Sequence, residues 1–359
     1  MGGSELRYVK DAFDKNWIAP VGPHIDMFEK DIEDYLGKGE AVAVQSGTAA
    51  LHLALIDADV GRDDVVLCQS FTFIGSVNPV LYQGATPVFI DSELETWNIC
   101  PEALETAIKK YIKIGKKPKA VIAVDLYGMP FKYLEVKELC DKYGILLIED
   151  AAEALGSKYG IFEESGVTEY KCGLLGDYGI LSFNGNKIIT TSGGGALITH
   201  RGTKNIKFLS TQAKEDKPYY EHETLGYNYR ISNISAAIGL GQMEVIGERV
   251  YKKRSIFNFY KENFTHIDFQ PEPENMHSNR WLTAGVMNSP EDRDELMSRL
   301  SEDNIESRHL WKPMHLQPLF KGSDYVGGNN AEVLFYKGIC LPSDSKMTQE
   351  DLTRVKEIV

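Results

Sequence analysis

Short apolar runs rich in β-branched residues recur along the first part of the chain, and polar helix-forming stretches separate them. Runs of this length and composition are typical of strands that are buried on both faces of a sheet. The predicted strands cover residues 41–44, 64–68, 86–90, 119–124, 144–149, 179–183 and 194–199. The stretches between them predict helices over residues 48–58, 101–112 and 132–143. Strand–helix alternation predicts right-handed crossovers and a mostly parallel sheet that helices cover.

The pattern changes in the last third of the chain. Residues 233–264 predict one long helix, and the chain beyond it alternates again on a smaller scale. A helix of this length commonly carries a chain out of a large domain. We therefore expect a large domain over residues 1–250 and a small α/β domain over residues 251–359.

Charge and cysteine content narrow the possible partners. The chain of 359 residues has 39 basic and 52 acidic side chains, which give a net charge of -13. Such an excess of negative charge disfavours nucleic acids and anionic membranes as partners. The five cysteines are scattered without a C-x-x-C pair, so we expect neither a disulfide framework nor a metal site. With a polar N-terminus and no apolar run near the length of a membrane span, the chain is expected to be cytoplasmic.

Candidate chemistry lies where the predicted strands end, because open sheets of this kind bind ligands at the carboxyl ends of their strands. In QSGTAALHLAL (45–55), a strand runs into Ser46, Gly47 and Thr48 and then into a helix. Free backbone N–H groups and hydroxyls at such a helix start form an anion site. An ordinary helix cap is the alternative for the same residues.

Two further strand ends carry a carboxylate and an aromatic ring. In GILLIEDAAEALGS (144–157), a buried strand runs directly into Glu149 and Asp150. A buried carboxylate is unfavourable unless it meets a cation or a donor, so Asp150 either caps a helix or pairs with a protonated ring nitrogen. In QSFTFIGS (69–76), Phe71 and Phe73 either join the core or stack on a planar ligand.

A single lysine follows another strand, in SFNGNKIITTSGGG (182–195). Lys187 stands between Ser182 and the glycines at 193–195, which allow close backbone contact. Alone, such a lysine is more often a solvated surface charge. Together, however, an anion site, a flat ring, a carboxylate and an amine match the phosphate, ring, pyridinium nitrogen and aldehyde of pyridoxal phosphate. The sequence therefore predicts an enzyme that uses pyridoxal 5'-phosphate.

The same segments resemble the sugar-nucleotide aminotransferases of the DegT/DnrJ/EryC1/StrS group. The motifs that carry the resemblance span nearly the whole chain: GGSEL, SGTAALHLAL, FTFIGSVNPVLYQGATPVFID, LYG, IEDAAEALGS, GDYGILSFNGNKIITTSGGG, GYNYRISNISAAIG and ESRHLWKPMHLQPLF. The resemblance implies an α/β protein of fold type I, like aspartate aminotransferase. Its large domain would have a mostly parallel mixed sheet, followed by a small C-terminal α/β domain.

The resemblance also implies a role for each residue of the cofactor site. Lys187 would form the Schiff base, and Asp150 would pair with the pyridine nitrogen. The residues implied to hold the phosphate are Thr48, Ala49 and Ser182, and those implied on the two faces of the ring are Phe73 and Ala152. Glu153 would lie next to the cofactor, at a position where relatives often have His or Gln. Asn228 is similar to a residue that reaches the phosphate of the other subunit, which implies a homodimer with shared active sites.

The residues predicted to bind the substrate are four cations and residues of the segment ESRHLWKPMHLQPLF. The cations expected to meet the diphosphate of a sugar nucleotide are Arg230, Arg280, Arg308 and Lys312, although each could equally be a solvated surface charge. The residues expected to line the sugar site are His309, Trp311 and His315. His309 also departs from the group, because many relatives have Pro there.

A second departure directs the prediction of substrate. Relatives usually have T-T-G-E-G-G after the lysine, whereas this chain has T-T-S-G-G-G at 190–195. This variant is similar to enzymes that aminate C4 of UDP-linked 4-keto-6-deoxy-N-acetylglucosamine on the route to bacillosamine. L-glutamate would donate the amino group, and pyridoxamine 5'-phosphate would be the intermediate form of the cofactor.

Four alternatives stay open at this stage. The enzyme could aminate C3 of a dTDP-linked 3-keto-6-deoxy sugar, or C4 of GDP-4-keto-6-deoxymannose. A sugar dehydrase of the same fold is disfavoured, because those relatives have His in place of Lys187. A non-catalytic protein on this fold is disfavoured by the complete set of Lys187, Asp150 and Ser182.

Overall fold

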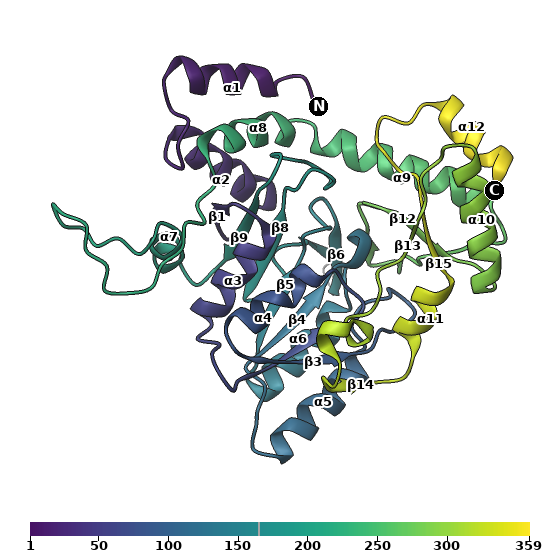
Figure 1. Ribbon diagram of the computed structural model, residues 1–359, viewed down its shortest axis with the longest axis horizontal. Helices are drawn as coiled ribbons and strands as arrows, with labels where there is room; N and C mark the ends of the chain where they lie inside the picture. Colours follow the sequence, from purple (N-terminus) through teal and green to yellow (C-terminus); the bar gives the residue numbers. More distant parts are fainter. Residues whose placement is uncertain (164–165) are drawn as a thin grey trace.

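A twisted eight-stranded sheet forms the centre of the molecule within residues 1–163 and 166–359, which the computed structural model describes (Figure 1). Its strand order is β1-β9-β8-β5-β4-β2-β3-β14. The strands are β1 (Glu40–Val44), β2 (Val65–Gln69), β3 (Thr86–Ile90), β4 (Ala120–Val124), β5 (Leu146–Asp150), β8 (Tyr178–Ser182), β9 (Gly195–Thr199) and β14 (Tyr325–Val326). Strand β9 is antiparallel to both neighbours, and the other pairs are parallel. The seven predicted strands and the mostly parallel sheet are confirmed.

Helices cover both faces of this sheet. One face packs against α2 (Pro23–Leu36), α5 (Pro101–Lys113), α6 (Tyr133–Tyr143) and α8 (Asn233–Met243). The other face packs against α3 (Gly47–Asp57), α4 (Asn78–Tyr82) and α7 (Lys204–Ser210). In β4, Val121 and Ala123 enter the first core while Ala120 and Ile122 enter the second. Alternate residues thus face opposite cores, which is why these strands are apolar throughout.

The C-terminal part has its own apolar core, built from residues 256 onward. This core lies between the antiparallel sheet β10-β12-β15-β13 and three helices. The helices are α9 (Ile246–Asn263), α10 (Pro290–Glu302) and α12 (Gln349–Ile358). The strands of this sheet are β10 (Asp268–Phe269), β12 (Thr283–Val286), β15 (Gly338–Leu341) and β13 (Arg308–His309). The remaining elements are α1 (Glu5–Asp14), α11 (Asn330–Lys337), β6 (Lys158–Glu163), β7 (Gly166–Lys171) and β11 (Met276–His277), with short 3-10 turns at Ile74–Ser76, Leu126–Gly128, Met314–Leu316 and Pro318–Phe320.

The chain beyond residue 250 also returns to the large sheet. Strand β14 pairs with β3 of the large sheet, whereas β11 pairs with β6 in a separate three-stranded sheet, β11-β6-β7. The domain boundary at residue 250 therefore stays a prediction. Among the residues that the structure describes, no helix combines the length and the apolar character needed to cross a lipid bilayer.

The prediction of one continuous helix over residues 233–264 is wrong. Helix α8 ends at Met243 and α9 begins at Ile246, because Val245 has φ -115° and ψ 8°, outside the helical range. A segment from the far end of the chain packs at this break. The side chain of Val245 lies against Gly2, where an added Cβ would be 2.9 Å from its methyl groups. The N-terminal segment thus occupies the junction of the two helices, and no local pattern reveals that contact.

Candidate active site

The start of α3 and the end of β8 form one end of a cavity of about 160 Å³. Ser46, Gly47, Thr48 and Ser182 all line this cavity. Ser46 is the N-cap of α3, and its Oγ accepts a hydrogen bond from the backbone N–H of Ala49 at 3.0 Å. The first-turn N–H groups of a helix lack partners within the helix, and the helix dipole favours negative charge there. This end of the cavity therefore suits a phosphate group.

Asp150, the last residue of β5, is buried and lines the same cavity. Ser76 donates its hydroxyl hydrogen bond to Asp150 Oδ2 at 2.6 Å, and the N–H of Ala152 donates to Oδ1 at 3.1 Å. Burial raises the pKa of Asp150, and the hydrogen bond from Ser76 opposes that rise. A carboxyl group held in this way stabilises a cation that enters the cavity.

Lys187 follows β8 and extends its amine toward Asp150 and Glu153. Its Nζ lies 3.6 Å from Glu153 Oε1 and 4.0 Å from the ring centroid of Trp281. Burial raises the pKa of Glu153, while the charge of Lys187 opposes the rise. The other oxygen of Glu153 accepts a hydrogen bond of 2.6 Å from the backbone N–H of Tyr127. The amine is therefore held beside an acid that can exchange a proton with it.

Aromatic side chains line the remainder of the cavity. Phe71 is completely buried, whereas Phe73 is 52% exposed and lines the cavity together with Ala152. The ring of Phe73 lies 5.5 Å from that of Trp311, which also lines the cavity. The sequence left two alternatives for these phenylalanines, the core or a ligand site. Phe71 joins the core, and Phe73 lines the candidate ligand site.

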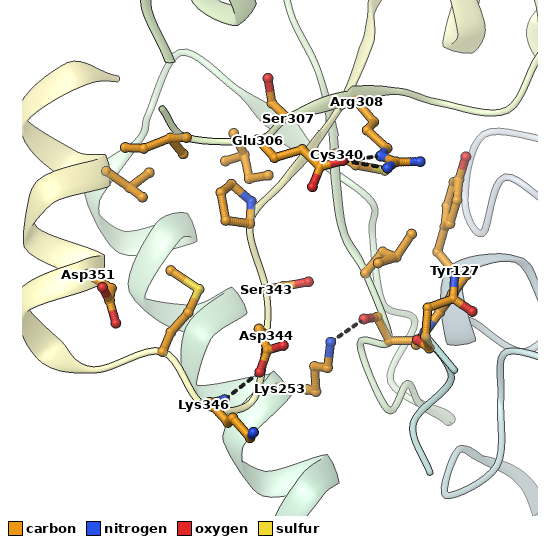
Figure 2. Close-up of a pocket in the computed structure, with 18 of the residues that line it drawn as sticks. Tyr127, Lys253, Glu306, Ser307, Arg308, Cys340, Ser343, Asp344, Lys346 and Asp351 are labelled. Carbon is orange, nitrogen blue, oxygen red and sulfur yellow. Dashed lines mark hydrogen bonds and ion pairs between the residues drawn. The ribbon is translucent and has the colours of Figure 1, made fainter. Parts of the chain in front are cut away.

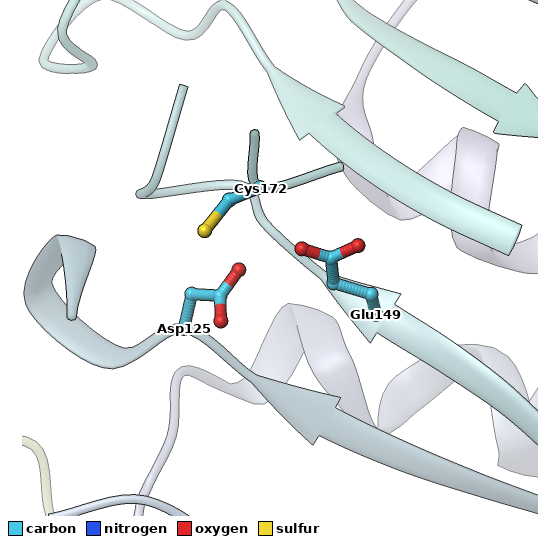
Figure 3. A group of neighbouring side chains, drawn as sticks. All are labelled: Asp125, Glu149 and Cys172. Atoms are coloured by element: carbon cyan, nitrogen blue, oxygen red, sulfur yellow. The ribbon is translucent and has the colours of Figure 1, made fainter. Parts of the chain in front are cut away.

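A buried acidic group includes Glu149, the residue that precedes Asp150 on β5 (Figure 3). Asp125, Glu149 and Cys172 each have an atom that could bind a metal ion, and these atoms lie within 4.8 Å of one another. All three side chains are buried. The two Glu149 oxygens accept hydrogen bonds from the backbone N–H groups of Gly173 and Leu175. Burial raises the pKa of Glu149 to about 7. Burial and the nearby Glu149 raise the pKa of Asp125 well above its usual range. Two carboxyl groups this close retain a shared proton, which we place on Asp125.

A second cavity, of about 690 Å³, opens beside the first (Figure 2). Asn186, Trp281 and Trp311 line both cavities, so the two adjoin. Arg308 and His309 of the predicted substrate set also line the larger cavity. Arg308 is exposed there and donates through Nε to Glu306 at 2.7 Å.

The structure places the other predicted residues outside these cavities. In the described part of the chain, neither cavity is lined by Ala49, Asn228, Arg230, Arg280, Lys312 or His315. Arg230 is paired with Glu29, and Arg280 is buried against Glu272 at 3.3 Å. His315 Nδ1 lies 2.7 Å from Ser70 Oγ, and Asn228 and Lys312 are exposed. Their functional roles stay predictions.

Sequence reasoning missed several residues that surround Lys187 and Asp150. Ser76 stands in the quoted segment QSFTFIGS, so the strand-end rule that selected Phe73 could have selected it too. Trp281 is buried, donates through Nε1 to the carbonyl of Asn186 at 2.6 Å, and arrives from the C-terminal part. No local signal marked Trp281 or Lys253, because only the fold brings them to the site.

The assembled groups fit pyridoxal phosphate. The helix start and Ser182 suit its phosphate, Phe73 and Ala152 suit the faces of its ring, and Lys187 suits its aldehyde. Asp150 gives the strictest test, because a buried carboxyl group in this cavity has the chemistry that a protonated ring nitrogen needs. Fold and site define the class of protein: an α/β aminotransferase of fold type I that depends on pyridoxal phosphate.

Comparison with known proteins identifies the family. Residues 1–359 match the DegT/DnrJ/EryC1/StrS aminotransferase family, and the chain belongs to it. EpsN of Bacillus subtilis (strain 168), named as a predicted pyridoxal phosphate-dependent aminotransferase, is 47% identical over 100% of this chain and 93% of its own. GDP-perosamine synthase of Escherichia coli O157:H7 is 35% identical over 99% of this chain and 95% of its own.

Solved structures agree with this assignment. The sugar aminotransferase Spr1654 of Streptococcus pneumoniae, in its PMP form, superposes with a TM-score of 0.90 at 25% identity and covers 99% of this chain and 95% of its own. A PLP form of the same protein is also known. The chain is therefore a pyridoxal phosphate-dependent sugar-nucleotide aminotransferase.

Proposed function

We propose that this enzyme transfers the amino group of L-glutamate to C4 of a UDP-linked 4-keto-6-deoxy sugar. The substrate would be UDP-2-acetamido-2,6-dideoxy-4-ketohexose, and the product UDP-4-amino-4,6-dideoxy-N-acetylglucosamine of the bacillosamine route. The T-T-S-G-G-G segment after Lys187, together with the preceding SFNGNK, supports this substrate. All five cysteines are free thiols, which is compatible with a reducing cytoplasm.

The observation that carries the proposal is the convergence of Lys187 and Asp150 in one cavity. When bound, pyridoxal phosphate supplies an aldehyde that exchanges amines and a ring that accepts an electron pair. Asp150 would hold a proton at the ring nitrogen. Lys187 would take a proton from the α-carbon of the amino donor and, in the second half of the reaction, deliver one to C4 of the sugar.

Glu153 would assist by exchanging a proton with Lys187. Its carboxyl group is buried and lies 3.6 Å from the amine, so a proton can pass between them without solvent. Transfer would turn an ammonium beside a carboxylate into a nucleophilic amine beside a carboxylic acid. The closure of the site around Trp281 and Trp311 would help to exclude water from these steps.

We infer further that the active unit is a homodimer with shared sites. Asn228 is exposed and lies outside the cavities of its own chain, as expected of a residue that serves the neighbouring subunit. It is presented by a segment whose backbone bridges to Thr211. The similarity of the segment GYNYR to the family supports the same arrangement.

The test is a substrate panel. Purified holoenzyme is incubated with L-glutamate and with UDP-, GDP- and dTDP-linked 3-keto and 4-keto sugars, and products are identified by NMR. We expect the highest kcat/KM with the UDP-linked 4-keto sugar and an amine at C4. A product aminated at C3 would contradict the proposal.

The matched control is Lys187→Ala, which should remain folded and lose at least about 10³-fold in kcat. Substantial remaining transamination would contradict the role of Lys187. A GDP-linked 4-keto-6-deoxymannose is the second candidate substrate, because a relative at 35% identity is named GDP-perosamine synthase. A higher kcat/KM with that sugar than with the UDP-linked sugar would make the GDP-linked sugar the preferred candidate substrate.

A further inference from the structure

Lys253 is the charged group of α9 that enters the larger cavity (Figure 2). Its Nζ donates a hydrogen bond of 2.9 Å to the carbonyl oxygen of Trp281. The ring of the same tryptophan lies 4.0 Å from the amine of Lys187. Trp281 therefore lies between Lys253 and Lys187. Asn186 and Trp311, like Trp281, line both cavities.

The ammonium of Lys253 has no counter-ion at contact distance. Across the described residues, no carboxylate oxygen lies within 4.0 Å of its Nζ, whereas Arg308 in the same cavity is paired with Glu306 at 2.5 Å. Asp344 attracts Lys253 from a longer distance, and Arg249 repels it. Burial lowers the pKa of Lys253 to about 8. A half-buried cation whose hydrogen-bond partner is a carbonyl oxygen is stabilised when an anion enters beside it.

The charges of the cavity favour a small anion. Lys346 is exposed at the rim, and Arg354 donates to the carbonyl oxygen of Asp303. The acidic lining residues are Glu306, Asp344 and Asp351. Lys253 thus presents one half-buried ammonium without a paired carboxylate at contact distance, which matches a single carboxylate better than a diphosphate.

We propose that Lys253 binds the side-chain carboxylate of the dicarboxylic amino donor, L-glutamate. This inference rests on the proposed function, because it assigns a specificity residue to the first half of that reaction. The α-carboxylate is attached to the reacting carbon and must stay in the smaller cavity beside Lys187. The carbon of the side-chain carboxylate is three bonds from the reacting carbon and would extend along Trp281, which lines both cavities, toward the larger one.

The first experiment measures amine transfer from L-glutamate to the enzyme by the absorbance of its cofactor in single-turnover mixing. Lys253→Met should raise the glutamate concentration for half-maximal rate by about 10- to 100-fold, since a buried hydrogen bond to a charged group is lost. Transfer from L-alanine, which lacks the second carboxylate, and the reaction with the keto sugar should be unchanged. Lys252→Met is the matched control, because Lys252 lies on the same helix, is 44% exposed and pairs with Glu248.

The second experiment needs no turnover. Calorimetric titration with glutarate, a dicarboxylate without an amine, should show binding to the wild-type holoenzyme and about tenfold weaker binding to Lys253→Met. Absence of glutarate binding to the wild type would overturn the inference even if the substrate panel supports aminotransfer. Equal losses with glutamate and alanine, or a loss confined to the keto sugar, would also overturn it. Failure of the panel with glutarate binding intact would instead count against the proposed function alone.

Discussion

At the scale of single residues, the protonation of Asp150 depends on competing effects. Burial raises its pKa, whereas the hydrogen bond from Ser76, the N–H of Ala152 and the charge of Lys187 lower it. Ser76 itself is held by Thr72, whose Oγ1 lies 2.8 Å from the Ser76 Oγ. The hydroxyl groups of Ser76 and Thr72 thus favour the carboxylate form of Asp150 against the effect of burial, and this is the form that would pair with a protonated ring nitrogen.

Ser76→Ala should therefore raise the pKa of Asp150. Loss of a hydrogen bond to a charged group corresponds to about one to two pH units, so the acid limb of kcat/KM should move to higher pH by that amount. Ser76→Thr keeps the hydroxyl and should restore the wild-type profile. The pH dependence of cofactor absorbance gives an independent measure, and an unchanged acid limb would refute a positioning role for Ser76.

A different consequence follows from the acidic group of Asp125 and Glu149. Because the pKa of Asp125 is raised by folding, the folded state binds the proton more tightly than the unfolded state. This contribution to the free energy of unfolding is fully present below the unfolded pKa, near pH 4, and is lost as pH rises through the folded pKa.

Asp125→Asn removes that titration but can still donate a hydrogen bond to Glu149. Between pH 5 and pH 8, urea unfolding of the variant should lose less stability than the wild type, by about 1–3 kcal/mol. The exposed Asp63→Asn is the control and should follow the wild-type pH dependence. Parallel pH profiles for the wild type and Asp125→Asn would disprove a shared proton.

At the scale of elements, Gly195 shows why a glycine stands at the start of β9, shortly after Lys187 in the chain. Gly195 begins β9 between Val44 of β1 and Ser182 of β8. A Cβ there would lie 2.4 Å from the backbone nitrogen of Gly47 and 2.7 Å from the carbonyl oxygen of Leu181. The phosphate-facing ends of β1, β8 and α3 can approach one another only without that side chain.

Gly195→Ala should therefore push these ends apart, lower the free energy of unfolding by about 1–3 kcal/mol or more, and weaken cofactor retention. Gly193→Ala is the matched control, because its Cβ would meet its nearest atom at 3.9 Å. Thermal unfolding and cofactor release during gel filtration measure both effects. Equal behaviour of the two variants would mean that the close approach at Gly195 is unimportant.

At the scale of the whole molecule, the placement of Asn228 outside its own cavities has a testable consequence. A mixture of Lys187→Ala and Asn228→Ala chains, unfolded and refolded together, should recover activity if each site uses residues of two subunits. Random pairing gives hybrids in half of the dimers, each with one intact site, so about a quarter of wild-type activity is expected. The chain of 40.2 kDa should also scatter light with twice that mass. A monomeric mass, or a mixture without activity, would contradict shared sites.

Local pattern predicted much of this architecture. The strands are continuous apolar runs because both faces of the sheet are covered, and a run of that kind is visible without knowledge of its neighbours. The strand-end rule then placed Thr48, Asp150 and Lys187 at one edge, and all three line the same cavity. The prediction of one long helix is wrong at Val245, where the chain packs against Gly2, a residue far away in the sequence.

The sequence by itself determined the alternating α/β design, the order of the strand-end motifs and the chemical types gathered there, since these follow from neighbours along the chain. Only the tertiary structure decided that Phe73 is exposed while Phe71 is buried. It also decided that the buried Arg280 pairs with Glu272 and that Ser76 donates a hydrogen bond to Asp150. It also brought Trp281 from the C-terminal part to Lys187, and Lys253 to Trp281. Burial and partner choice depend on segments that meet only after folding, so the same residue type can become a core group, an ion pair or a ligand.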